Sequence, residues 1–450
     1  MPEIVYEALP VAKSNPDLFL DTIQVFDNVR RQKVRCAIMW ERLFISLARQ
    51  SIRMGTLDLT LPDGRQISLG DGEAPMGTIH IHDSNVFRKF LRHPEVAMGE
   101  TYMDGTMTVP NGDLKALLTV LLRNSKAGNL PPMQAIARRA RVALRHLSSL
   151  NSLRRSQRNV ELHYDLPVEF FDLFMEEDKQ YTCAYFRHPD ETLEQAQANK
   201  KRHIAKKLLI EPGMRVLDIG SGWGGLAITL AQDFGALVTG VTLSQVQLDA
   251  AALRVRDAGV GDQIEFRLQD YRNVAGRFDR VVSVGMMEHV GKPQYPAFFN
   301  KIANLLEDDG VAVVQYIGRS SPPDMISPWF SKYIFPGGYT PSLSEVIPAV
   351  ENSGLHLVDL EVWRGQYERT LQHWQGRFEG NIDKISELVD KRFERMWRYY
   401  LNAAELGFSE KHMVLHQMQL SKQRYKVPPT RDYLYGTEDT KVNNDPSNSD

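Results

Sequence analysis

A glycine-rich turn between an apolar run and a helix-forming run, in residues 216–231, constrains this chain more than any other feature. The segment is VLDIGSGWGGLAITLA, in which the apolar run ends at Asp218 and the turn contains Gly220, Gly222, Gly224 and Gly225. A strand, a tight turn and a helix in this order let the backbone approach a ligand, and the helix N-terminus faces that ligand. Alone, the pattern predicts a nucleotide-like pocket without naming the nucleotide.

Alternating strand and helix patterns surround this turn. The apolar strand candidates are residues 215–220, 237–244, 264–270, 278–285 and 311–318. Helical stretches between them predict an α/β fold, with a parallel sheet, right-handed crossovers and a ligand at the carboxyl ends of the strands. Two further strands are expected at 356–365 and 412–422, the second of them as an antiparallel edge strand.

The chain is long enough, at 450 residues, for two or three domains. Residues 1–125 combine amphipathic helices with short alternating strands and a Pro-Asp-Gly turn, which predicts a smaller α+β domain associated with lipid or membrane. Residues 126–160 are expected to be a basic helical linker and 161–430 the α/β domain. The polar end, 431–450, is expected to be disordered.

Arginines crowd the expected linker with no acidic residue among them: Arg138, Arg139, Arg141, Arg145, Arg154, Arg155 and Arg158. One interpretation is a solvated helix face with a basic linker. The other is a docking surface for anionic phospholipid headgroups, at roughly 1 kcal/mol per basic residue near the membrane. Nucleic acid is not expected, because no interleaved aromatic residues or known binding motif accompany the arginines.

The composition of the chain indicates the cellular compartment in which the protein is expected to work. The formal net charge is -2, and two cysteines, Cys36 and Cys183, lie far apart in the sequence. A disulfide framework is therefore not expected, and a reducing, cytoplasmic compartment fits better. The N-terminus shows no secretory pattern, and no run approaches the roughly 20 apolar residues of a membrane span. Membrane contact is expected to be peripheral, and a homodimer is kept as a hypothesis.

The residues after the strands distinguish between nucleotide cofactors. A dinucleotide site needs an acid after the second strand, where this chain has Thr242 and Gln247, and no Walker lysine follows the glycines. Asp218 could instead receive a cationic ligand, while Asp270 and Tyr271 suit an adenine amino group and ring. These features favour S-adenosylmethionine over NAD or ATP. The alternative is that Asp218 only orders the loop and Tyr271 only packs.

The match then becomes specific to a family. From HYDL (163–166) onward the chain resembles the cyclopropane-fatty-acyl-phospholipid synthases and mycolic acid cyclopropane synthases. The matching motifs are QYTCAYF (180–186), PGMRVLDIGSGWGGLA (212–227), GVTLSQVQ (240–247), QDYRNVAGRFDRVVSVGMMEHVG (269–291), YIFPGGYTPS (333–342), ERTLQHW (368–374), ERMWRYYLNAAELGF (394–408) and, in the N-terminal domain, GETYMDG (99–105).

The resemblance implies a Rossmann-like class I methyltransferase sheet with helices on both faces. It also implies methyl transfer from S-adenosylmethionine to the cis double bond of an unsaturated acyl chain in a membrane phospholipid, giving a cyclopropane at the inner face of the membrane. The motif QYTCAYF adds Tyr181 and Thr182 to the cofactor-binding residues. In the family a bound bicarbonate takes up the proton that the cationic acyl chain loses. Its counterpart holders here are Cys183, Glu288, the backbone of Ile317, and Tyr367, with Gln315 beside them.

Three positions depart from the family pattern. Gln315 stands where a histidine is usual, and an amide can donate to an anion but cannot carry a proton. Ala404 stands where many members have cysteine, and Leu166-Pro167 replaces the usual Gly-Asn. A methylene- or methyl-branched product and an inactive lipid- or cofactor-binding relative therefore stay open, as does methylation of a soluble small molecule. Metal is not expected.

An aromatic segment at 322–342 follows the fifth strand and contains Trp329 and Phe330. Broken by proline and glycine, it suggests a mobile apolar lid through which an acyl chain enters. The alternative is an ordinary packed insertion.

Overall fold

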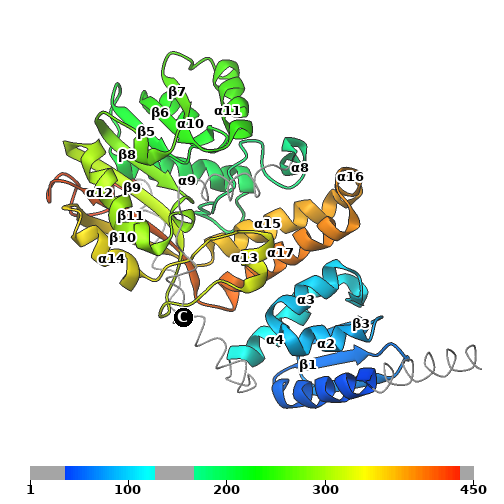
Figure 1. Ribbon diagram of the computed structural model, residues 1–450. Helices are drawn as coiled ribbons and strands as arrows, with labels where there is room; N and C mark the ends of the chain where they lie inside the picture. The colour runs from blue at the N-terminus through cyan, green and yellow to red at the C-terminus, as the bar shows by residue number, and fades with distance from the viewer. Residues whose placement is uncertain (1–35, 127–166, 436–450) are drawn as a thin grey trace, which may run out of the picture.

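The computed structural model describes residues 36–126 and 167–435, which form a smaller N-terminal region and a larger α/β region (Figure 1). All seven arginines of the expected basic linker, and the tail from residue 436, lie outside the described residues. Within the described ranges no helix is long and apolar enough to cross a membrane.

A seven-stranded sheet forms the centre of the larger region, in the order β10-β11-β9-β8-β5-β6-β7. The strands are β5 (Arg215–Ile219), β6 (Leu237–Thr242), β7 (Ile264–Leu268), β8 (Phe278–Val284), β9 (Leu306–Arg319), β10 (His356–Trp363) and β11 (Met413–Ser421). Neighbouring strands from β9 to β7 are parallel, whereas β11 is antiparallel to both β9 and β10. The predicted α/β fold is confirmed, with the five predicted parallel strands in place.

The expectation of an edge strand at 412–422 was half right. β11 is antiparallel, but it lies between β9 and β10 and is hydrogen-bonded on both sides. Gln417 and Gln419 are fully buried, and their Nε2 atoms donate to Gln315 and to the carbonyl of Lys207. β10 is the edge strand on this side of the sheet, and β7 is the edge strand on the other.

Helices cover both faces of the sheet. On one face, α9 (Leu193–Leu208), α10 (Gly225–Phe234) and α11 (Gln245–Asp257) pack against alternate strand residues such as Val216 and Val282. On the other, α12 (Tyr295–Leu305) and α14 (Leu343–Glu351) pack against Leu217 and Val281. Successive strand residues point to opposite faces, so one apolar run supplies both layers. Short 3-10 turns, η2 (Tyr271–Asn273), η3 (Met287–His289) and η4 (Lys292–Gln294), follow strands β7 and β8.

The N-terminal region is a four-stranded sheet with helices. A helix over residues 36–51 precedes β1 (Thr56–Thr60), β2 (Gln66–Gly70), β3 (Met76–Ile81), α2 (Asn85–Arg92), α3 (Pro94–Met103), β4 (Met107–Thr108), η1 (Pro110–Gly112) and α4 (Leu114–Lys126). The sheet order is β2-β1-β3-β4. The predicted Pro-Asp-Gly hairpin joins β1 to β2, where the N–H of Gly64 donates to the carbonyl of Leu61.

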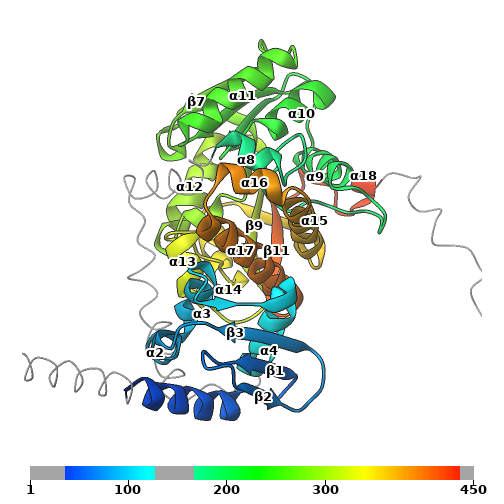
Figure 2. The same cartoon turned by 90° about the vertical axis from the view of Figure 1, so that its right-hand side faces the viewer.

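A helical layer separates the two sheets (Figure 2). It contains α15 (Gln366–Gly380), α16 (Ile382–Leu388) and α17 (Lys391–Ser409), with α8 (Val168–Asp172) and α13 (Pro328–Tyr333) beside them. One hydrophobic cluster runs from the N-terminal strands through this layer. The two regions therefore share a core and are not joined by the chain alone.

The motif GETYMDG, in α3 and the turn after it, forms one contact between the regions. Gly99 leaves space for the indole of Trp329, because any Cβ there would overlap the indole ring. Glu100 accepts hydrogen bonds from Lys332 and Tyr333, each at 2.6 Å. Trp329 itself is fully buried, with its Nε1 3.3 Å from the sulfur of Met103. The structure thus favours the packed insertion over the lid at Trp329, since this side chain holds the regions together.

The folded chain also extends past the expected boundary at residue 430. A short helix, α18 (Asp432–Tyr435), follows, and Lys206 of α9 donates to the carbonyl of Leu434 at 2.7 Å. Leu434 is buried. The first five residues of the expected tail are therefore ordered by contacts that only the folded chain provides.

Candidate active site

The carboxyl ends of β5 to β8 surround a pocket, where an open α/β sheet binds its ligand. Nine residues predicted to bind the cofactor line it: Tyr181, Thr182, Asp218, Gly220, Gly222, Thr242, Gln247, Asp270 and Tyr271. Gly224 does not line it. It is the N-cap of α10 with φ +81°, and a Cβ there would meet the ring of Phe266 at 2.7 Å. Gly224 therefore serves the packing of the turn.

Asp218 is the charged group of this pocket. It is buried, burial raises the pKa of its carboxyl to about 7, and its Oδ2 has no hydrogen-bond partner among the described residues. A buried carboxylate without a partner is costly, and a cationic ligand would relieve that cost. Beside it, Gly222 has φ +53° and open space where a Cβ would lie. The turn therefore offers bare backbone and one carboxylate, which fits the cationic donor S-adenosylmethionine.

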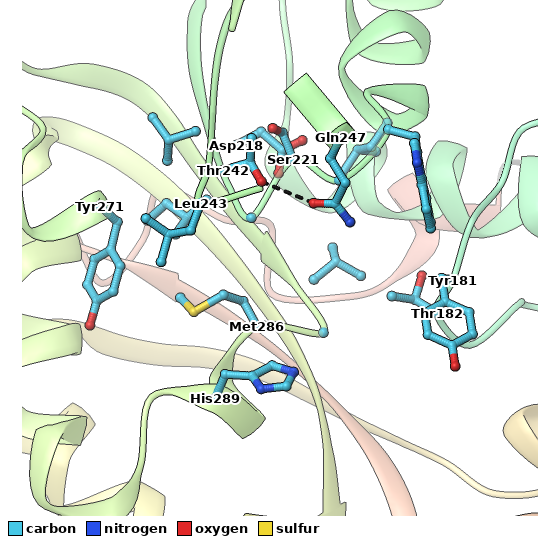
Figure 3. Close-up of a pocket in the computed structure, with 18 of the residues that line it drawn as sticks. Tyr181, Thr182, Asp218, Ser221, Thr242, Leu243, Gln247, Tyr271, Met286 and His289 are labelled. Carbon is cyan, nitrogen blue, oxygen red and sulfur yellow. Dashed lines mark hydrogen bonds between the residues drawn. The ribbon is translucent and has the colours of Figure 1, made fainter. Parts of the chain in front are cut away.

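Thr242 and Gln247 act as a pair. The hydroxyl of Thr242 donates to Oε1 of Gln247 at 3.0 Å and accepts the N–H of Ser244 at 3.2 Å (Figure 3). With its oxygen engaged, the Gln247 amide keeps its nitrogen as a donor toward the pocket (Figure 3). Thr242 therefore orients Gln247, which is the group suited to ribose hydroxyls at this strand end.

Asp270 and Tyr271 lie at the end of β7 as predicted, with an addition that the sequence did not suggest. Arg272 donates three hydrogen bonds to the Asp270 carboxylate, at 2.7 to 2.9 Å. A carboxylate has about four acceptor sites, so room for an adenine amino group remains but is reduced. The Tyr271 ring packs edge-on against Phe298, with centroids 5.5 Å apart, which holds it at the pocket wall.

Residues 180–183 are held by α9. The ammonium group of Lys200 is buried and donates to Oε1 of Gln180 at 2.8 Å and to the hydroxyl of Thr182 at 2.7 Å. Gln197 donates to the backbone carbonyls of Gln180 and Thr182 at 3.0 and 2.9 Å. This loop lies between two cavities, so α9 positions the boundary between them.

A second, apolar cavity of about 1600 Å³ adjoins the first. Four residues line both: Tyr181, Thr182, Gly285 and His289. All five residues predicted for catalysis line the second cavity: Cys183, Glu288, Gln315, Ile317 and Tyr367. A Cβ at Gly285 would meet Thr182 at 2.8 Å, so the wall between the cavities needs glycine here. The sequence set these residues far apart, and the fold collects them beside the donor pocket.

Glu288 follows β8 in η3 and points into this cavity. Its Oε1 accepts the backbone N–H of Ile317 at 2.6 Å, and its Oε2 has no partner among the described residues. Burial raises the pKa of Glu288 to about 7. The backbone of Ile317 was predicted to hold an anion. Here it holds the carboxylate of Glu288, so any anion would share or displace this contact.

Gln315 is anchored by a residue that the sequence did not single out. Nε2 of Gln417, opposite it on β11, donates to Oε1 of Gln315 at 2.9 Å. Nε2 of Gln315 then has no partner among the described residues, although the side chain is 1% exposed and lines the cavity. Gln315 thus offers a buried donor where the family usually has an ionisable ring.

Cys183 and Tyr367 complete the wall. Cys183 is fully buried, and burial raises the pKa of its thiol far above the usual value. The thiol is therefore expected to be neutral at neutral pH, the form that is the poorer nucleophile. Tyr367 packs against Phe408 and Trp374, with ring centroids 4.7 and 6.1 Å away.

Comparison with known proteins agrees with this geometry. Residues 151–418 match the family model of mycolic acid cyclopropane synthetase. The chain is 35% identical to the cyclopropane-fatty-acyl-phospholipid synthase of Escherichia coli K12 over 355 residues, covering 78% of this chain and 89% of the relative. This chain belongs to the mycolic acid cyclopropane synthetase family.

Other relatives of the family differ in the reaction that their names give. The tuberculostearic acid methyltransferase UfaA1 of Mycobacterium tuberculosis is 34% identical over 390 residues, covering 84% of this chain and 90% of its own. Among solved structures, the mycolic acid cyclopropane synthase CmaA1 complexed with SAH and CTAB has a TM-score of 0.57 at 28% identity, covering 61% of this chain and 99% of that one. As a member of this family the chain is an S-adenosylmethionine-dependent methyltransferase.

The N-terminal region matches a second model, described as a domain of unknown function, at residues 45–128. No group of His, Cys, Asp and Glu side chains suited to a metal occurs within 36–126 and 167–435.

The donor pocket also includes residues that were not predicted to bind the cofactor, among them Lys200, Ser221, Met286 and His289. Burial lowers the pKa of His289 to about 4, so its ring is neutral at neutral pH. Ser221, Met286 and His289 lie within motifs that carry the family resemblance, whereas Lys200 lies outside all of them.

Proposed function

We propose that this chain transfers the methyl group of S-adenosylmethionine to the cis double bond of an unsaturated acyl chain in a membrane phospholipid, giving a cyclopropane. The observation that supports this most is the shared wall at Thr182 and Gly285. On one side lies a pocket with the unpartnered carboxylate of Asp218, and on the other a largely apolar cavity of about 1600 Å³. A polar donor and an apolar acceptor can therefore meet at one boundary.

The chemistry explains which side chains the reaction needs. The bound donor supplies an electrophilic methyl group next to a sulfonium, and an alkene supplies the attacking electron pair. No nucleophilic side chain is required, which agrees with the neutral thiol of Cys183. The residues of the apolar wall exclude water from the cationic acyl chain, and one proton must then leave that chain.

A bicarbonate ion is the expected acceptor for that proton, and the residues present fit an oxyanion. Gln315 offers an unpartnered N–H, and Glu288 offers an unpartnered oxygen that can share a proton because its pKa is raised to about 7. Cys183, Tyr367 and the N–H of Ile317 would complete the set of holders. Gln315 would donate to the anion without supplying positive charge, which favours weaker binding than a histidinium would give.

One experiment separates the leading function from its alternatives. The chain is expressed in a bacterial host that lacks such enzymes, and its fatty acids are identified by mass spectrometry. An acyl chain that has gained one carbon, as part of a cyclopropane ring, supports the proposal. Unchanged fatty acids, with intact donor binding by calorimetry, would identify a lipid- or cofactor-binding relative instead.

A methylene- or methyl-branched product is the second candidate, favoured by Gln315 and by the name of the tuberculostearic acid relative. The same cation can shift a hydride and lose a different proton. In the same host, exchange of Gln315→His tests whether this position determines which proton the cationic acyl chain loses. An altered ratio of cyclopropane to branched product would assign that role, and an unchanged ratio and rate would remove it.

The membrane is the proposed source of substrate. The protein is expected to bind peripherally at the cytoplasmic face through the N-terminal region and the arginine-rich stretch. The proposal is supported by the substrate class and by the sequence. The structure does not bear on it at the arginines, which lie outside the described residues.

A further inference from the structure

The apolar cavity has walls from both regions of the chain. Its reaction end is lined by Cys183, Glu288 and Gln315 of the α/β region. Its other walls include the core-facing side chains of the N-terminal sheet, namely Leu57, Leu59, Ile79 and Ile81. Alternation along β1 and β3 puts these four on one face, and Leu59 lies directly opposite Ile79. The N-terminal region is thus hollow on the face where a domain normally packs tightly.

A polar rim lies on the same cavity. Its residues are Ser51, Ser125, Ser321, Lys411 and His412. Polar contacts bring these segments together: Asn124 accepts the N–H of Met54 at 3.0 Å, Arg123 pairs with Glu410 at 2.8 Å, and the backbone N–H of Ser320 donates to the carbonyl of His412 at 2.9 Å. A phosphate-bearing headgroup belongs at such a rim, because burying its charge in an apolar cavity is prohibitively costly.

Two walls of the cavity lead away from this rim. Along α4, the cavity-lining face runs from Asn124 through Leu121 to Leu118, about 9 Å at 1.5 Å per residue, toward the N-terminal sheet. Along β9, it runs from Arg319 through Ile317 to Gln315, about 13 Å at 3.3 Å per residue, toward the donor pocket. Between the arms, α17 contributes Ala403, Ala404 and Gly407.

We propose that the N-terminal arm holds the second, unreacted acyl chain of a two-chain lipid whose other chain lies at the reaction end. Two apolar arms with one polar rim match a lipid with two acyl chains on one charged headgroup. A free fatty acid would need one arm. The inference rests on the proposed function, and it gives the N-terminal domain a specific ligand.

The test compares two substrates in one tube. Detergent micelles contain equal amounts of palmitoyl-oleoyl phosphatidylglycerol and its single-chain form, oleoyl lysophosphatidylglycerol, and products are quantified by mass spectrometry. The ratio of the two products does not depend on how much enzyme is folded. Ile79→Trp narrows the N-terminal arm, and we expect it to lower the two-chain to single-chain product ratio by about tenfold or more. Ile79→Ala should not lower it.

Thr78→Trp is the matched control, because Thr78 is the neighbouring residue of β3 and points to the opposite face. It should leave the ratio unchanged. If Ile79→Trp does not fold, Leu118→Phe narrows the same arm from α4 and carries the same expectation. A ratio equal to that of the parent in the folded arm variants would overturn the proposal. Absence of methyl transfer to both lipids by the parent would instead overturn the proposed function.

Discussion

At the scale of single residues, the site depends on a few buried polar groups whose partners are incomplete. Asp218, Glu288 and Gln315 each keep one side-chain atom without a partner among the described residues. Interiors normally satisfy such groups, so three of them around adjoining cavities indicate ligands. Their residue types were predicted from motifs. Gln417, which orients Gln315, was not, because a glutamine in a buried strand carries no motif.

Exchange of Asp218→Asn is expected to weaken S-adenosylmethionine binding by about ten- to hundredfold, the worth of a charge-assisted contact. The pKa of Asp218 is about 7 in the free protein, and a cation binds its ionised form. Parent affinity should therefore fall as pH drops below 7, by at most about tenfold per pH unit, and the variant should lack this slope. Calorimetry measures both. Asp249→Asn, on the exposed surface of α11, is the control. Equal affinity and slope in parent and Asp218→Asn would contradict this role.

Exchange of Gln417→Leu removes the donor that orients Gln315. We expect kcat to fall about fivefold to tenfold, since one hydrogen bond contributes about 1 kcal/mol, with donor affinity unchanged. Steady-state kinetics with calorimetry separates the two effects. Met418→Leu, the next residue on the opposite face, should change neither. A loss of donor affinity parallel to kcat would indicate a folding defect and not a positioning role.

At the scale of elements, α3 and α13 connect the two regions through Trp329 and Gly99. This contact explains the motif GETYMDG, whose glycine and glutamate both face α13. Trp329 was predicted as a lid residue because aromatic residues beside proline and glycine suggest an exposed loop. The actual partners lie more than 200 residues earlier in the chain, and local pattern cannot supply them.

Exchange of Trp329→Ala should therefore lower the free energy of unfolding by about 3 to 5 kcal/mol, as for a large aromatic removed from a core. Denaturant unfolding followed by circular dichroism measures this change. Donor affinity should persist in the folded fraction, because Trp329 does not line the donor pocket. Tyr425→Ala, at a side chain that is 85% exposed, should shift stability by less than about 0.5 kcal/mol. A Trp329 variant as stable as the parent would argue for the lid after all.

At the scale of the whole molecule, the two regions act as one enzyme because they share one core and one cavity. The N-terminal region encloses the acceptor side, whereas the donor side belongs to the α/β region alone. This division lets a common methyltransferase sheet serve a lipid substrate.

Binding to vesicles tests the arginine-rich stretch. Replacement of Arg138 and Arg139 by glutamine should weaken co-sedimentation with phosphatidylglycerol vesicles by roughly 2 kcal/mol, about thirtyfold, at low salt. Added salt should reduce the difference, because it screens surface charge. The matched control replaces Arg364 and Arg424, two exposed arginines of the α/β region. Equal loss in both double variants would assign binding to net charge alone.

The sequence by itself determined the α/β architecture and predicted the donor pocket and the five residues proposed for the reaction end. It could do so because strand periodicity, the glycine turn and the family motifs are local patterns. The tertiary structure alone decided that β11 is internal, that Gly224 packs and Trp329 joins the regions, and that Gln417 holds Gln315. These outcomes depend on contacts between segments that are distant along the chain. Such contacts form only when folding brings the segments together, so no local sequence pattern specifies them.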